Sequence, residues 1–193
     1  MNIIQIGCND CDDDVFKFVS LNRDTISKFL VIDALPDCVA IAKEKYSFLG
    51  ERLYPVNCGV GVKTGITQFY YPKGDKFSAH ASLLESHLRN HSHQSLECLC
   101  VPVLGINDVL SFFDHVDRLY IDIEGLDVSA LLSLDFSNFK PSYIEYESAH
   151  ADGTALRAAN DLKLNNLLIS LGYQTKRNGE YNSVAELSPA SSI

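Results

Sequence analysis

Acidic and amide side chains stand directly after four apolar runs of this sequence. The positions are Asn9 and Asp10, Asp33, Asn57, and the pair Asp122 and Glu124. In an open α/β sheet the carboxyl ends of parallel strands meet at one edge, and ligands bind there. We therefore expect these side chains to surround one ligand. The alternative is that each of them only caps the helix that follows.

The turn after the first run, Ile3–Ile6, is the most informative of these positions. Gly7 lets the backbone pass close to a ligand, and the helix that follows offers unpaired N–H groups. Asp33 is suited to accept hydrogen bonds from the two hydroxyls of an adenosine ribose. We therefore expect a nucleotide-binding turn. A dinucleotide-dependent oxidoreductase is one alternative, but the turn lacks the G-x-G-x-x-G pattern.

Strand-like runs alternate with helical patterns on either side of these positions. The expected strands are 3–6, 29–32, 52–58, 118–122 and 142–147, and the expected helices are 12–21, 36–46, a helix after Gly105, a helix containing Val128, and 154–171. This alternation predicts a doubly wound, mostly parallel sheet with helices on both faces. We treat residues 1–193 as a single domain, with a terminal antiparallel pair around Asn178-Gly179 and a flexible tail over 188–193.

The middle of the chain departs from this alternation. The runs Ile66–Tyr71 and Glu97–Val103 are rich in β-forming residues and predict a hairpin. Residues 72–95 between them are polar, hold four of the six histidines, and are expected to form a mobile loop or lid. Because the chain as given starts at the first strand, either this segment or a second subunit is expected to cover the ligand. The exposed edge near 66–71 makes a homodimer a candidate assembly.

Composition excludes several classes of partner. The net charge of −9 is spread along the chain without a dense stripe of Lys and Arg, so we expect no nucleic-acid partner. No apolar run approaches the ~20 residues of a membrane span, and the first segment lacks the features of an export signal. We expect no membrane partner and a cytoplasmic location. The six cysteines are interpreted as reduced thiols that serve as small apolar residues.

Four motifs in this order resemble the FkbM family of S-adenosylmethionine-dependent methyltransferases. They read IQIGCND at 4–10, VIDALP at 31–36, VNCGVG at 56–61, and RLYIDIEG at 118–125. The family typically has an I-G-A-N-D-G-like turn, an acidic residue before a Pro, and K-I-D-V-E-G. The segment 121–125 is the most specific match, and the resemblance covers residues 3 to about 150.

The resemblance implies a class I methyltransferase sheet of seven strands with the last antiparallel, S-adenosyl-L-methionine as cofactor, and methyl transfer to an oxygen, often a sugar hydroxyl. Its implied donor site consists of Gly7, Cys8, Asn9 and Asp10 at the methionine part, Asp33 with Ala34 at the ribose, and Asn57 with Cys58 at the adenine. Asp122 and Glu124 would face the methyl group. Alignment of an acceptor oxygen supplies most of the catalysis in such a reaction, and a carboxylate can take the hydroxyl proton.

Two positions differ from the family pattern. Cys11 stands where a second Gly is usual, and Tyr120 replaces the usual Lys. A donor-binding protein of the same fold without transfer activity is therefore the second alternative.

A small hydroxylated molecule such as a carbohydrate is the expected acceptor. Glu147 and His150 follow the fifth strand and are candidates to bind its hydroxyl or act as base. His80 and Ser82 in the polar segment are candidate acceptor-binding residues. The alternatives are a surface carboxylate with a helix-capping His, and an exposed loop His.

Two other chemistries compete for these residues. Cys8 and Cys11 have the spacing of a redox pair, but acidic residues follow at 12–14 and would oppose a thiolate. His87, His91 and His93 approximate a metal-ligand spacing. A solvated polar loop explains these histidines as well, so we expect no bound metal and keep a zinc site as the alternative.

Overall fold

The central strand β1 (Asn2–Ile6) is buried along its whole length. It pairs in parallel with β2 (Lys28–Asp33) on one side and with β7 (Arg118–Ile121) on the other. A strand covered on both faces is mostly apolar rather than alternating. The buried Gln5 is accommodated because its amide donates to Asp13 and accepts from the Tyr46 hydroxyl.

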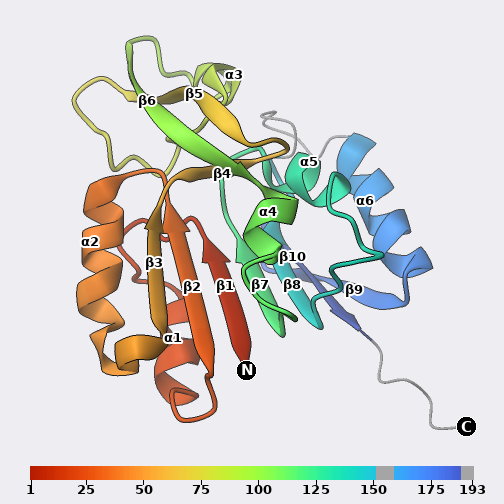
Figure 1. Cartoon of the computed structure of the whole chain (residues 1–193). Coiled ribbons are helices and arrows are strands. Elements are labelled where there is room, and N and C mark those ends of the chain that lie inside the picture. Colours follow the sequence, from red (N-terminus) through yellow and green to blue (C-terminus); the bar gives the residue numbers. More distant parts are fainter. Residues whose placement is uncertain (151–158, 188–193) are drawn as a thin grey trace, which may run out of the picture.

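The computed structural model describes residues 1–150 and 159–187. Its main sheet has seven strands in the order β3-β2-β1-β7-β8-β10-β9 (Figure 1). The strands not yet given are β3 (Leu53–Asn57), β8 (Tyr143–Glu147), β9 (Tyr173–Asn178) and β10 (Asn182–Leu187). β10 is antiparallel to both of its neighbours, whereas β3, β2, β1, β7 and β8 are parallel. The predicted mostly parallel seven-stranded sheet is confirmed.

Helices cover both faces of this sheet, as predicted. The helices are α1 (Asp14–Leu21), α2 (Pro36–Lys45), α3 (Glu85–Asn90), α4 (Ile106–Leu110), α5 (Asp127–Leu132) and α6 (Ala159–Ser170), with a 3-10 helix η1 at Ser47–Arg52. Ile3 of β1 packs in one core with residues of α1 and α2, and Ile4 packs in the other with residues of α4, α5 and α6. Neighbouring side chains of a strand point to opposite faces, so one strand contributes to both cores.

Local sequence signals determine where α1 and α2 begin. The Asp13 carboxylate accepts a hydrogen bond of 2.7 Å from the Phe16 N–H and caps α1. Pro36 stands in the first turn of α2, where its fixed φ and missing donor are tolerated. Both helices therefore start directly after the turns that follow β1 and β2, at the edge where the candidate residues lie.

A second sheet of three strands lies above the carboxyl ends of the parallel strands (Figure 1). It consists of β4 (Gly59–Gly61), β6 (Leu96–Gly105) and β5 (Gly65–Pro72), and β5 pairs antiparallel with β6. The predicted hairpin is confirmed, whereas β4 was not predicted. All six cysteines are free, in agreement with the interpretation as reduced thiols, but Cys98 and Cys100 on β6 are exposed and do not serve as small apolar residues of a core.

The polar segment 72–95 is more ordered than the predicted loop. It contains α3, and Ser82 pairs with Tyr70 through an isolated bridge. Ser82, His87 and Leu88 are buried. The fully buried Leu88 fixes this segment in place, and the polar composition of the surrounding residues gave no sign of it.

The C-terminal prediction also agrees with the described residues. Gly172 follows α6 with a φ of +93°, a left-handed conformation that suits glycine after a helix. The predicted antiparallel pair is β9 and β10. The predicted helical residues 154–158 and the predicted tail 188–193 lie outside the described residues. Among residues 1–150 and 159–187, no helix combines the length and apolar character needed to cross a membrane.

Candidate active site

A cavity of ≈ 210 Å³ lies where the carboxyl ends of β1, β2 and β7 meet the three-stranded sheet. Most of the predicted donor-site residues line it: Gly7, Cys8, Asn9, Asp10, Asp33, Ala34, Cys58 and Asp122. Glu124 lines it too. Apolar side chains that include Leu35, Phe69 and Phe77 complete the wall. The cavity therefore combines acidic and apolar surfaces.

Gly7 lets two strand ends come into contact at the floor of this cavity. Its φ is +77°, and a Cβ placed there would lie 1.8 Å from the backbone oxygen of Asp122. No side chain fits at that distance, and L residues also rarely adopt this φ. The glycine therefore sets the separation between the β1 turn and the β7 end.

Asp33 ties the end of β2 to the β1 turn. Its Oδ2 accepts hydrogen bonds from the N–H groups of Cys8 at 3.0 Å and Asn9 at 3.2 Å, and its Oδ1 accepts one of 2.9 Å from Leu35. A carboxylate offers about four acceptor positions. Three are used by the backbone, and the Cys8 thiol donates a weaker bond of 3.6 Å to Oδ2. Within the described residues Oδ1 accepts only the Leu35 N–H, so it can accept a further donor in the cavity.

Asn57 is the predicted donor-site residue that does not line the cavity. Its side-chain amide donates hydrogen bonds of 3.0 Å to the backbone oxygens of Asp33 and Ala34. It holds the end of β2 against the end of β3. We infer a positioning role for Asn57, and its predicted contact with the adenine stays a prediction.

The backbone of the β1 turn explains the family pattern at position 11. Asn9 and Cys11 have φ values of +41° and +53°. Glycine adopts this region without cost, and asparagine tolerates it better than most residues. Cys11 occupies the left-handed conformation with its side chain fully buried, so the turn accepts a side chain there that points into the core and not into the cavity.

The two cysteines of this turn are poorly suited to redox chemistry. The Cys8 thiol is buried, and its pKa is raised by a hydrogen bond with Cys11, by burial, and by the charge of Asp33. Reactivity requires a thiolate. The geometry therefore argues against the thiol-disulfide alternative.

The segment after β7 gathers three carboxyl groups. Asp122 is open to the cavity, yet protein surrounds it closely, and its pKa is raised to about 6 by loss of solvation and then by the charge of Glu147. Burial and the charge of Asp122 raise the pKa of Glu124, whose backbone has a φ of +52°. Burial, followed by the charge of Asp122, also raises the pKa of Asp127. Asp127 accepts hydrogen bonds of 3.3 and 3.4 Å from the Ile123 N–H, so it fixes this loop.

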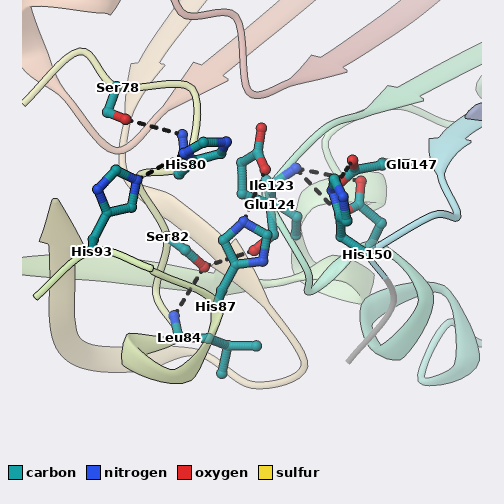
Figure 2. Close-up of polar contacts among 11 residues, drawn as sticks. Ser78, His80, Ser82, Leu84, His87, His93, Ile123, Glu124, Glu147 and His150 are labelled. Atoms are coloured by element: carbon teal, nitrogen blue, oxygen red, sulfur yellow. Dashed lines mark hydrogen bonds and ion pairs between the residues drawn. The ribbon is translucent and has the colours of Figure 1, made fainter. Parts of the chain in front are cut away.

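The polar segment 72–95 places its side chains against this loop. The Ser82 hydroxyl donates a 2.7 Å hydrogen bond to the Glu124 backbone oxygen, as Figure 2 shows. His80 Nδ1 lies 2.8 Å from His93 Nε2 and forms a hydrogen bond with it. Neither Ser82 nor His80 lines the cavity, although Ser78, Ala79 and Ala81 beside them do. Their predicted contact with an acceptor stays a prediction.

His87, Glu124, Glu147 and His150 form a group that we call the histidine–carboxylate cluster (Figure 2). His87 Nε2 lies 3.1 Å from Glu124 Oε2, and His150 Nδ1 lies 2.7 Å from Glu147 Oε1. His87 is fully buried and Glu147 is 8% exposed. The prediction of a solvated loop was therefore wrong for His87. Burial, and then the neighbouring histidines, lower its pKa to about 3, so its ring is neutral near pH 7.

Sequence reasoning missed two features of this edge of the sheet: the position of His87 beside Glu124, and the role of Asp127. His87 was noticed only by its spacing from other histidines, and nothing local connects it with residues 124–150. Asp127 stands in the first turn of α5, where an acidic residue is ordinary. His87 is followed by the buried Leu88 in a short helix, and this pattern is only a weak sign that His87 is buried too. The contact between these distant segments could therefore be found only in the structure.

The sequence matches the Methyltransferase FkbM domain over residues 5–175. The chain belongs to the FkbM methyltransferase domain family. The predicted family is thus confirmed by a match that covers most of the chain, including the four motifs except for the first residue of the first one. Among curated proteins, none matches the sequence.

Solved structures with the same fold are distant in sequence. The FkbM methyltransferase from Methylobacillus flagellatus KT has a TM-score of 0.61 and 15% identity, over 96% of this chain and 43% of that protein. The methyltransferase PaMTH1 from Podospora anserina, solved with SAH bound, has a TM-score of 0.51 and 11% identity, over 97% of this chain and 72% of that protein. The chain thus spans less than half of the first protein's length. At these identities the likeness supports the fold.

Proposed function

We propose that this chain binds S-adenosyl-L-methionine in the cavity beside Gly7 and transfers its methyl group to a hydroxyl oxygen of a small acceptor such as a carbohydrate. One observation carries the proposal: the cavity at the carboxyl edge is lined by the glycine turn, by Asp33 and by Asp122 together. Family membership and the SAH-bound relative from Podospora anserina support the donor.

The residues present fit such a donor. Asp33 keeps acceptor capacity for a ribose hydroxyl, the polar residues 7–10 suit the charged methionine part, and Leu35 and Phe69 offer an apolar surface for a base. The bound sulfonium supplies an activated methyl group, so the protein has mainly to align an oxygen with it. Asp122 and Glu124 line the cavity at the end of β7 and are placed to hold or accept the hydroxyl proton.

Donor binding is tested by calorimetric titration of the full chain with SAH and, separately, with NAD. We expect saturable binding of SAH at one site and no binding of NAD. Binding of NAD without SAH would favour the oxidoreductase alternative and contradict the proposal.

The role of Asp122 is tested by Asp122→Asn in an assay that follows methyl transfer to a panel of hydroxylated acceptors. Loss of a proton-accepting group typically costs about 100-fold or more in rate, so we expect such a fall in kcat with SAH affinity retained. Asp114→Asn is the matched control, because Asp114 is exposed outside the cavity. Full activity of Asp122→Asn would remove this assignment, and SAH binding without turnover on any acceptor would favour the donor-binding alternative.

A further inference from the structure

Buried polar atoms without hydrogen-bond partners concentrate in the histidine–carboxylate cluster. Within the described residues they include His87 Nδ1 and Nε2, Glu147 Oε2 and His150 Nδ1. Buried polar groups are nearly always paired in folded proteins, and leaving one unpaired is unfavourable. Several such atoms at one place indicate a partner that is not a protein side chain.

The distances within the cluster are those of atoms that share a ligand. One oxygen or nitrogen of each of Glu124, Glu147 and His150 lies within 4.8 Å of the others. His87 Nε2 lies 3.1 Å from Glu124 Oε2, but His87 does not belong to the group whose ligand atoms all lie within 4.8 Å of one another, so it stands beside that group. Nitrogen and oxygen ligands stand about 2 Å from a transition-metal ion, so two ligands of one ion are about 3 Å apart.

The orientation of the close pairs agrees with this interpretation. His87 and His150 approach their carboxylates to 3.1 and 2.7 Å, yet His87 Nε2 and His150 Nδ1 have no hydrogen-bond partner. A ring nitrogen that lies this close to a carboxylate oxygen without the geometry of a hydrogen bond is in a suitable place to share a metal ion with that oxygen. His80 and His93 differ, because their ring nitrogens pair with each other.

The carboxyl groups at this edge have no Lys or Arg beside them. None of the carboxyl groups of Asp122, Glu124, Asp127 and Glu147 forms an ion pair with a Lys or Arg of the described ranges, and the basic groups closest to Glu124 and Glu147 are the imidazoles of His87 and His150. Carboxylates at short range repel one another. A divalent cation would offset this repulsion and pair with the orphaned atoms at once.

We propose that Glu124, Glu147 and His150 bind one divalent first-row transition-metal ion, with Zn²⁺ the ion we expect. One imidazole and two carboxylate donors suit Zn²⁺ and its neighbours, whereas Mg²⁺ and Ca²⁺ prefer oxygen alone. The ligands come from the loop after β7, from the end of β8 and from the residues that follow β8, and His87 of α3 lies beside Glu124. An ion held there joins the segments after β7 and β8. Because Glu124 also lines the cavity, the ion would lie at the cavity's edge, next to the expected acceptor.

The test uses the full chain with any purification tag removed and in a Cys98→Ser/Cys100→Ser background, because those exposed thiols could bind zinc themselves. Chelator-treated protein is titrated with ZnCl₂ by calorimetry and with CoCl₂ while visible d–d absorption is followed. We expect one ion per chain and a cobalt spectrum that Zn²⁺ displaces.

Variants locate the ion. Glu147→Gln changes no volume and should weaken Zn²⁺ binding about 10-fold or more, since even indirect partners of metal ligands are worth about 10- to 100-fold. His150→Ala should do the same. His115→Ala is the matched control: it is an exposed histidine 3.6 Å from Asp117, outside the cluster, and should leave the affinity unchanged.

Two outcomes would overturn the proposal. One is the absence of stoichiometric Zn²⁺ and Co²⁺ binding by the folded chain with all three ligands in place. The other is equal Zn²⁺ affinity in Glu147→Gln and the parent protein, which would place the ion elsewhere. SAH is titrated separately into metal-free protein, so failure of donor binding and failure of metal binding are distinguished.

Discussion

The two sides of the carboxyl edge satisfy their polar groups in opposite ways. Around the glycine turn, Asp33 accepts three backbone N–H groups and Asn57 donates to two backbone oxygens. In the histidine–carboxylate cluster, buried ring and carboxylate atoms have no such partners among the described residues. The difference teaches that polar residues at one edge have two tasks. Those on the first side shape a cavity, and those on the second are the residues that we propose bind an ion.

The largest expected effect breaks the first side. Gly7→Ala forces a Cβ into the backbone oxygen of Asp122 and places Ala at a φ of +77°. We expect the free energy of unfolding to fall by about 3 kcal/mol or more, from overpacking together with left-handed strain, and SAH binding to be lost. Chemical denaturation and SAH calorimetry measure both.

Gly179→Ala separates the cost of the steric clash from the cost of the left-handed backbone conformation. Gly179 has a φ of +73°, but nothing lies within 4 Å of the position of its Cβ. This variant should lose only about 1 kcal/mol, the cost of the left-handed conformation. Equal losses in the two glycine variants would contradict the role assigned to the contact between β1 and β7.

The next effect acts on the second side. If the histidine–carboxylate cluster is completed by an ion, Zn²⁺ at 100 times its dissociation constant should raise the free energy of unfolding by about 2.7 kcal/mol. EDTA should reverse the rise. Thermal denaturation of the Cys98→Ser/Cys100→Ser protein measures the shift, and Glu147→Gln should show little of it. A Zn²⁺ shift of the same size in Glu147→Gln would speak against this side as the site.

A smaller effect tests whether Asp33 acts through its charge. In Asp33→Asn an amide NH₂ replaces one acceptor oxygen, so at least one backbone N–H of the turn faces another donor. Hydrogen bonds to charged groups are worth about 1.5–3 kcal/mol, and we expect SAH affinity to fall about 10- to 100-fold. Asp24→Asn, an exposed change away from the cavity, should bind SAH normally. Unchanged SAH affinity in Asp33→Asn would show that the carboxylate does not shape the site.

The smallest expected effect concerns the reactivity of the cysteine thiols and needs no substitution. Burial raises the pKa of the Cys58 thiol to about 11, and burial with the charge of Asp33 raises that of Cys38 to about 12. Their thiolate fraction is minute near pH 8 and grows about tenfold for each pH unit above it. Iodoacetamide followed by mass spectrometry should modify exposed Cys98 and Cys100 first, and SAH should slow the modification of Cys58, which lines the cavity. Rapid modification of Cys58 at pH 8 would contradict the burial of its thiol in the wall of the cavity.

The sequence was a good guide to the first side because its signals are local. Apolar runs ended by Gly7 and Asp33 mark strand ends, and parallel strands bring their ends together. β4 was missed because Gly59–Gly61 is too short and too rich in glycine to show a period of two. α3 was missed as well, because its six residues are mostly polar and their sequence resembles that of a loop.

The second side could not be predicted, because its members come from separate parts of the chain. His87 and His150 are 63 positions apart (150 − 87), and only the packing of α3 against the loop after β7 brings them together. Spacing within the segment 72–95 favoured His87 with His91 and His93 as possible ligands. The structure does bring His87 and His91 together, with ring centroids 4.6 Å apart, but it also places His87 beside Glu124 and pairs His93 with His80.

The ladder between β5 and β6 has a consequence for how such a chain can diversify. Pro72 and Leu96 are directly paired across the two strands, so the segment that carries α3 leaves and re-enters the fold at a single point. An exchange of that segment for another would leave every strand of the main sheet in register. Such an exchange would alter the wall of the cavity that Phe77, Ser78 and Ala81 supply, while the glycine turn, Asp33 and Asp122 would stay in place.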